Sequence, residues 1–212
     1  MKLTPEELSA QQFVLMDQLD HDDIVPFIQQ NLKKWTSYAV IYFIANMLSF
    51  GLAGFLLVRG WKHPEYSIAS DIGSFITGLT LAFLLLPLHE YIHVLAYRSQ
   101  GAKQTSYAAN LRKFYFMALA DRFVANKKEF TIVALAPFVS ITAILLILFF
   151  ALNPFWQPTV VGTLLLHTAM CSGDFGLLCY LEIHRDKEIV TYDDVPAKLT
   201  YFYGRQGKMN QD

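Results

Sequence analysis

Apolar residues gather in four long runs along the chain, and short polar joints separate the runs. The runs cover residues 35–58, 72–97, 131–152 and 159–181. Each run is close to the roughly 20 residues that an α-helix needs to cross the hydrocarbon core of a bilayer. The pattern therefore predicts an all-α polytopic membrane protein with four transmembrane helices.

The joint between the second and third runs has a different character. Residues 101–130 interleave aromatic side chains with Lys and Arg, and they contain β-prone pieces such as residues 113–117. Irregular backbone lies at membrane depth only where protein or water satisfies its polar groups. We therefore expect a re-entrant or β-hairpin-like segment at the membrane surface. It either presents a strand edge to an extended substrate or serves as a basic, aromatic membrane anchor.

The N-terminal segment carries a helix-start pattern. Thr4 is a suitable cap, and Glu7 is placed to close a capping box. Apolar residues follow at loosely helical spacing up to Leu19, and a second short helix is expected to begin at Asp22 or Asp23. The segment therefore predicts a helical arm.

Polar ends and an apolar middle divide the chain into three parts. We expect a cytosolic or interfacial helical arm over residues 1–34, a membrane-embedded core over residues 35–182 and a cytosolic tail over residues 183–212. Within the tail, residues 189–192 are β-prone and predict a short strand.

Composition and charge agree with a membrane protein. Apolar residues make up 54% of the chain, and the formal charge is −1 with dispersed basic residues, so we expect no nucleic-acid partner. Seven Lys and Arg residues lie between the second and third runs, counted from Arg98, and none lies between the third and fourth. The positive-inside bias therefore places both termini in the cytosol. We expect an integral protein of a prokaryotic cytoplasmic membrane.

A His-Glu-x-x-His pattern lies inside the second apolar run, at residues 89–93. Its histidines, His89 and His93, share one face of a helix, one turn apart, where two imidazoles can bind one metal ion. Glu90 is close enough to reach a metal-bound water as a general base. The pattern therefore predicts hydrolytic chemistry at a zinc ion.

Asp174 in the fourth run is the expected third ligand. At 1.5 Å per helical residue, His89 and Asp174 lie about 13 and about 12 Å from the cytosolic ends of their runs, so their depths agree. A zinc ion held by both histidines and Asp174 would offset the cost of burying the carboxylates. His167 and Cys171 lie on the same helical face as Asp174 and are the alternative ligands, or partners of the ligands.

Further stretches accompany residues 89–93: Ala-Leu-Ala-Pro at residues 134–137, Ser-Gly-Asp at residues 172–174, and the tail at residues 186–192. Together they resemble a family of small membrane-embedded zincin peptidases, formerly a domain of unknown function, that is similar to the site-2 group of intramembrane metalloproteases. The resemblance covers residues 81–202.

The resemblance implies that His89 and His93 are zinc ligands, that Glu90 is the catalytic base and that Asp174 is the third ligand. The function expected is a zinc-dependent endopeptidase that cleaves membrane proteins or peptides in or at the lipid bilayer. Two alternatives remain open: an ion transporter that binds its cation at these residues, and a catalytically silent relative that binds a partner in the same groove.

Overall fold

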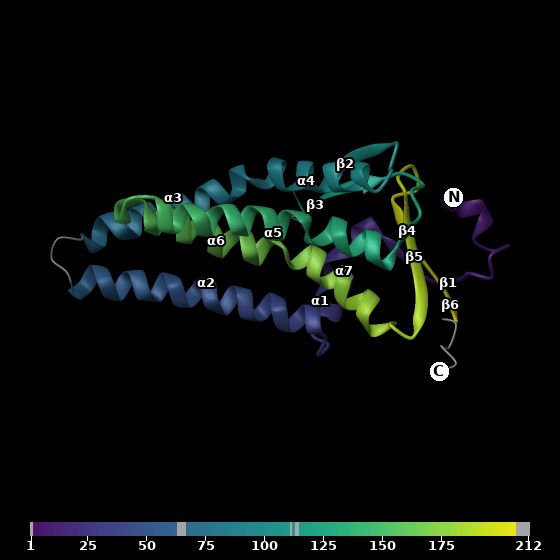
Figure 1. Ribbon diagram of the computed structural model, residues 1–212, viewed down its shortest axis with the longest axis horizontal. Helices are drawn as coiled ribbons and strands as arrows, with labels where there is room; N and C mark the ends of the chain where they lie inside the picture. Colours follow the sequence, from purple (N-terminus) through teal and green to yellow (C-terminus); the bar gives the residue numbers. More distant parts are fainter. Residues whose placement is uncertain (1, 63–66, 111, 113–114, 207–212) are drawn as a thin grey trace.

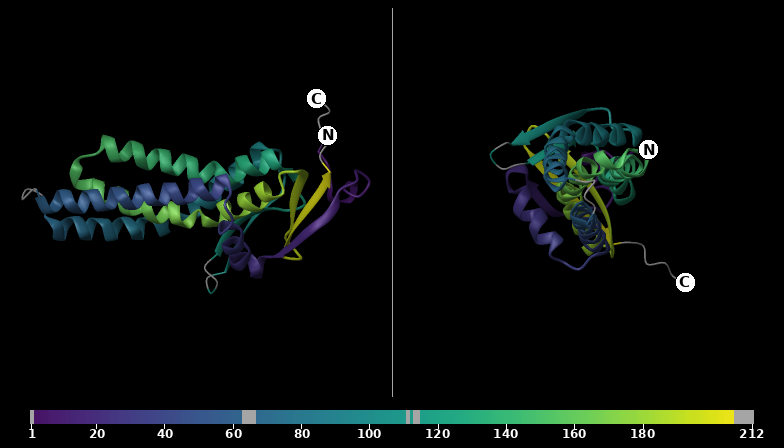
Figure 2. Two further views of the ribbon diagram at one scale, coloured as in Figure 1. Left: turned by 90° about the horizontal axis from the view of Figure 1, so that it is seen from below. Right: turned by 90° about the vertical axis from the view of Figure 1, so that its left-hand side faces the viewer.

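The computed structural model describes residues 2–62, 67–110, 112 and 115–206, and it is mostly helical (Figure 1). Long helices run along the long axis of the molecule, and a small β-sheet lies at one end (Figure 1, Figure 2). The helices are α1 (Ile24–Leu32), α2 (Ser37–Lys62), α3 (Ile68–Leu84), α4 (Leu86–Ser99), α5 (Lys127–Ala151), α6 (Gln157–Met170) and α7 (Ser172–Ile183). Short 3-10 turns are η1 (Pro5–Glu7), η2 (His21–Asp23) and η3 (Pro154–Trp156).

Three helical stretches of the described chain are long and apolar enough to cross a bilayer: Ser37–Lys62, Lys127–Ala151 and Pro154–Ile183. The bent pair α3 and α4, which meet at 41°, is a fourth candidate. The four predicted runs therefore correspond to three or four candidate spans. The bend lies at Leu85, and Pro87 in the first turn of α4 has no backbone N–H to donate to the preceding turn.

The prediction of an all-α fold is wrong, because the chain also forms a four-stranded antiparallel sheet in the order β1-β6-β5-β4. The strands are β1 (Val14–Asp20), β4 (Ala125–Asn126), β5 (Lys187–Asp194) and β6 (Leu199–Gln206). Strands β1 and β6 come from opposite ends of the chain, so neither local pattern reveals its partner. The strand predicted at residues 189–192 is confirmed as part of β5.

The N-terminal arm is only partly helical. The Glu7 carboxylate accepts the Thr4 backbone N–H at 2.8 Å, as the capping-box pattern predicts. The helical spacing up to Leu19 is misleading, because this stretch pairs as β1 with β6. Helix α1 follows Asp23, which confirms the second predicted helix start.

The joint between the second and third apolar runs contains a β-hairpin, which confirms the hairpin-like element. Strands β2 (Thr105–Asn110) and β3 (Tyr115–Ala120) pair antiparallel and form a sheet of their own. The hairpin contacts α4 (Figure 1). Of the β-prone residues 113–117, the first two lie outside the described residues.

A buried carboxylate connects the hairpin, the sheet and the N-terminal arm. Asp193 accepts hydrogen bonds from the Thr200 hydroxyl at 2.8 Å and from the Ala120 backbone N–H at 3.2 Å. The Thr200 oxygen lies 3.1 Å from His21 Nε2, and since Thr200 gives its own proton to Asp193, His21 is the donor in that contact. Burial raises the pKa of the Asp193 carboxyl to about 6, and the nearby Asp121 contributes in the same direction.

Two glycines let α3 and α6 approach until their backbones touch. A Cβ at Gly78 would overlap the carbonyl oxygen of Thr159, and a Cβ at Gly162 would overlap that of Phe75. The Thr163 hydroxyl also donates to the Gly78 carbonyl at 3.0 Å. Small residues at a contact between apolar helices allow this close approach.

Replacing Gly78 with Ala should force α3 and α6 apart and cost about 1–3 kcal/mol of stability. Purified Gly78→Ala protein is therefore expected to unfold at a lower temperature than wild type in the same detergent. Gly51→Ala is the matched control, because a Cβ there meets nothing within 4 Å and Ala is the better helix former. An unchanged midpoint for Gly78→Ala would show that the two backbones do not touch.

Asp193 should make the protein less stable as pH rises from about 4 to about 6. Because the pKa of this carboxyl is about 6 in the folded chain and about 3.9 in the unfolded chain, the folded state binds more protons in that window. Across this pH window, the free energy of unfolding of wild type should fall by on the order of 3 kcal/mol relative to that of Asp193→Asn. Unfolding temperatures measured against pH check this, with the exposed Asp186→Asn as control. If the difference in unfolding temperature between wild type and Asp193→Asn stays constant with pH, the prediction is wrong.

Candidate metal centre

Two histidines of α4 direct their rings at one buried point. His89 and His93 are 7% and 6% exposed, and the i, i+4 spacing places them one turn apart on the same face. Their Nε2 atoms lie 3.1 Å apart. Zinc–nitrogen bonds are about 2.0–2.1 Å long, so one ion can bind both nitrogens at close to this separation.

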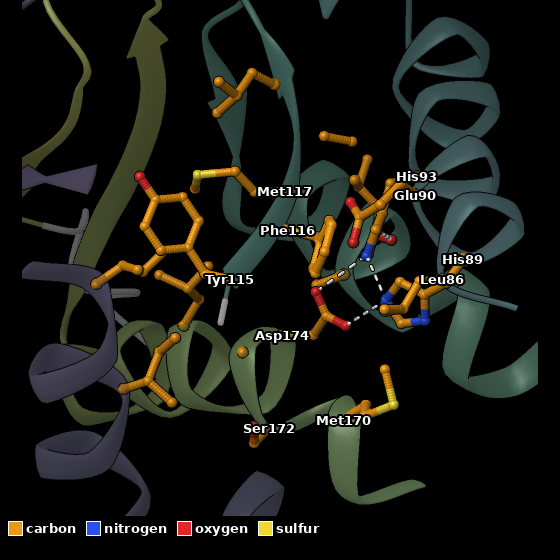
Figure 3. Close-up of a pocket in the computed structure, with 18 of the residues that line it drawn as sticks. Leu86, His89, Glu90, His93, Tyr115, Phe116, Met117, Met170, Ser172 and Asp174 are labelled. Carbon is orange, nitrogen blue, oxygen red and sulfur yellow. Dashed lines mark hydrogen bonds and ion pairs between the residues drawn. The ribbon is translucent and has the colours of Figure 1, made fainter. Parts of the chain in front are cut away.

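Asp174 reaches the same point from the first turn of α7 (Figure 3). Its Oδ2 lies 3.3 Å from His89 Nε2, and its Oδ1 lies 3.1 Å from His93 Nε2. One ligand atom from each of the three side chains can be chosen so that all lie within 4.8 Å of one another. The structure therefore brings side chains of the second and fourth apolar runs together at one point. The roles of these side chains stay predictions.

Glu90 lies beside His93 and faces the same pocket (Figure 3). It is 8% exposed, and its Oε2 atom is buried with no hydrogen-bond partner among the described residues. A buried carboxylate oxygen without a partner is costly. Together with the imidazole nitrogens and the Asp174 oxygens next to it, this atom fits a site that could take a divalent cation and a water molecule.

The two alternative ligands lie at the same centre. His89, His167 and Cys171 form a second group whose ligand atoms lie within 4.8 Å of one another. Cys171 Sγ is 3.9 Å from His167 Nε2, and the ring centroids of His167 and His89 are 5.7 Å apart. Of the two groups found in the described chain, only the one with Asp174 includes both histidines of the His-Glu-x-x-His pattern; the choice of third ligand stays a prediction.

A backbone carbonyl that the sequence interpretation did not assign orients His93. The His93 Nδ1 atom lies 2.9 Å from the carbonyl oxygen of Val133 in α5. A histidine that donates its second ring N–H to such an acceptor keeps the other nitrogen free to bind metal. The sequence feature that points to this carbonyl is Pro137, since a proline inside a helix frees the carbonyl four residues before it.

A cavity of about 650 Å³ opens at these side chains. Residues 115–119 of β3 all line it. Because alternate residues of a strand point to opposite faces, five consecutive lining residues mean that the edge of β3 borders the cavity. Within the described residues, β2 pairs with the other edge of β3.

Helix α1 forms another wall of the cavity. Its side chains Val25, Ile28 and Leu32 are apolar and line the space. The helix lies close against α7, because a Cβ at Gly176 would be 3.0 Å from the Ile28 Cα. The N-terminal arm is therefore part of the candidate site, although the sequence interpretation left it outside.

One comparison with known proteins agrees with the chemistry of this centre. A family model described as "Putative zincin peptidase" matches residues 82–188, which is about half of the chain. No curated protein and no solved structure matches. The matched segment contains both histidines, Glu90, Asp174 and the hairpin. The chain therefore belongs to this family of zincin peptidases.

Proposed function

We propose that this protein is a zinc-dependent endopeptidase that cleaves membrane-associated or transmembrane substrates at a site inside the membrane. The observation that carries the proposal is the convergence of His89, His93 and Asp174 in the interior of the helical bundle, with Glu90 beside them. Membership of a zincin peptidase family supports the same chemistry.

Insertion in a bilayer is supported by the surface of the helices as well as by their length. Many large apolar side chains of α2 and α5 are more than half exposed in the isolated chain, a surface that lipid rather than water would cover. They include Phe43, Ile44, Met47, Leu48, Phe50, Val139, Ile144, Ile147 and Phe150. The basic joint that holds the hairpin lies at the sheet end of the molecule (Figure 2), which supports placing that end in the cytosol.

His89 and His93 would hold zinc through Nε2, and Asp174 would hold it through a carboxylate oxygen. Zinc with three protein ligands polarises a water molecule and the substrate carbonyl. The Glu90 carboxylate is placed to take the proton of the attacking water and to deliver it to the leaving amine.

The edge of β3 suggests how a substrate binds. An extended peptide that adds to this edge would form main-chain hydrogen bonds that do not depend on its sequence. Such a peptide would run past Glu90 and Asp174, because residues 115–119 line the same cavity as both carboxylates. The apolar side chains of α1 on another wall favour an apolar substrate side chain near the cleaved bond.

Removing a ligand should remove the metal. Wild type is expected to keep a stoichiometric zinc ion through dialysis, whereas His93→Ala and Asp174→Ala should lose it, by metal analysis of the purified proteins. His167→Ala should keep it, as should the control His184→Ala, whose ring bonds the Tyr180 carbonyl away from the centre. Full zinc in Asp174→Ala with none in His167→Ala would make His167 the third ligand. Rapid zinc flux into liposomes would favour a transporter.

Replacing Glu90 with Gln should separate binding from catalysis. The variant keeps the shape of the side chain but loses the base, so zinc content should be unchanged while cleavage falls by about 10²–10⁴-fold. Cleavage of a labelled library of transmembrane peptides in liposomes measures this, with the exposed Glu188→Gln as matched control. Wild-type rates in Glu90→Gln would remove Glu90 from the mechanism.

A further inference from the structure

Pro137 interrupts the backbone hydrogen bonds of α5 where that helix passes the metal centre. The residue lies inside the helix and is fully buried. Because proline has no backbone N–H, the carbonyl four residues earlier loses its usual helical donor. In α5 that carbonyl belongs to Val133.

The Val133 carbonyl instead faces His93. The oxygen lies 2.9 Å from His93 Nδ1, and the two residues are 2% and 6% exposed. A carbonyl can only accept, so the proton of this bond is on Nδ1. The lone pair of Nε2 is then free and points at His89 and Asp174, whose nearest atoms are 3.1 Å away.

We propose that Pro137 is a positioning residue for the metal centre: it releases the Val133 carbonyl so that this carbonyl holds His93 in the orientation and tautomer that bind zinc. This rests on the zinc site of the proposed function and adds a residue that does not touch the metal. Partners of metal-binding histidines typically contribute 10–100-fold to metal affinity.

A residue with an N–H at position 137 would compete with His93. Its amide would lie one helical turn from the Val133 carbonyl and would draw that oxygen back toward the helix axis. The contact with His93 would lengthen, and the ring could then adopt either tautomer. Zinc binding would have to select one ring position from several, which lowers affinity.

The test is Pro137→Ala in the full chain. Zinc affinity, measured by competition with a coloured chelator, is expected to fall about 10–100-fold. The metal-free variant should nevertheless unfold at a higher temperature than wild type, because Ala is a far better helix former than Pro. Pro158→Ala is the matched control: Pro158 is buried but lies in the first turn of α6, where the missing N–H frees no carbonyl inside the helix.

The opposite directions of these two changes distinguish positioning from a structural role. If zinc affinity and unfolding temperature both fall, Pro137 only maintains the fold and the proposal is overturned. Unchanged affinity also overturns it. Nitrogen-15 NMR of labelled histidines gives an independent readout: His93 should carry its proton on Nδ1 in metal-free wild type and on a mixture of both nitrogens in Pro137→Ala.

A second variant keeps the proposal testable if Pro137→Ala does not fold. Exchanging the amide that joins Val133 to Ala134 for an ester leaves every side chain in place and makes the Val133 carbonyl a weaker acceptor. Zinc affinity should fall, while the same exchange one bond later, between Ala134 and Leu135, should leave it unchanged. Equal affinities overturn this proposal alone, whereas a wild type that binds no zinc overturns the proposed function as well.

Discussion

The rest of the structure depends on how two carboxyl groups are accommodated among apolar helices: Glu90 is buried and Asp174 is partly buried. A charged carboxylate, such as Glu90 or Asp174 would carry, costs about 2.5–3.5 kcal/mol at the centre of a bilayer. Two imidazoles next to Asp174 reduce that cost, and a divalent cation would offset it further. The bend at Leu85 and the break between α6 and α7 at Cys171 both lie within a few residues of this cluster, so the helices are irregular where the polar groups meet.

The sheet end of the molecule and the N-terminal arm form part of the walls around the candidate metal centre. Asp193 connects β3, β5 and β6, and through Thr200 it reaches His21 of the N-terminal arm. The arm in turn holds α1 against α7, so the cavity has walls from parts of the chain that are far apart in sequence. The family match covers His89, His93, Asp174 and β3 but not α1. The matched segment thus holds every residue of the proposed zinc site, and the arm contributes to the shape of the cavity beside it.

Local patterns predicted those features whose causes are local. The i, i+4 spacing of His89 and His93 and the β-prone joint between the apolar runs each depend on neighbours in sequence. The proximity of Asp174 to the two histidines follows only from comparing positions in the second and fourth apolar runs, because no local pattern connects these runs. The pairing of β1 with β6 depends on contacts across nearly the whole chain, so the all-α prediction failed there. The contact of the Val133 carbonyl with His93 is not visible in the residue type, because every residue has a backbone carbonyl.

The most direct test of the account is X-ray absorption spectroscopy at the zinc edge on wild-type protein loaded with a stoichiometric amount of zinc. Two imidazoles and oxygen ligands should surround the ion if His89, His93 and Asp174 hold it. The imidazole signal should fall in His93→Ala. A sulfur atom from Cys171 in the coordination shell, or protein that holds no zinc, would contradict the central claim.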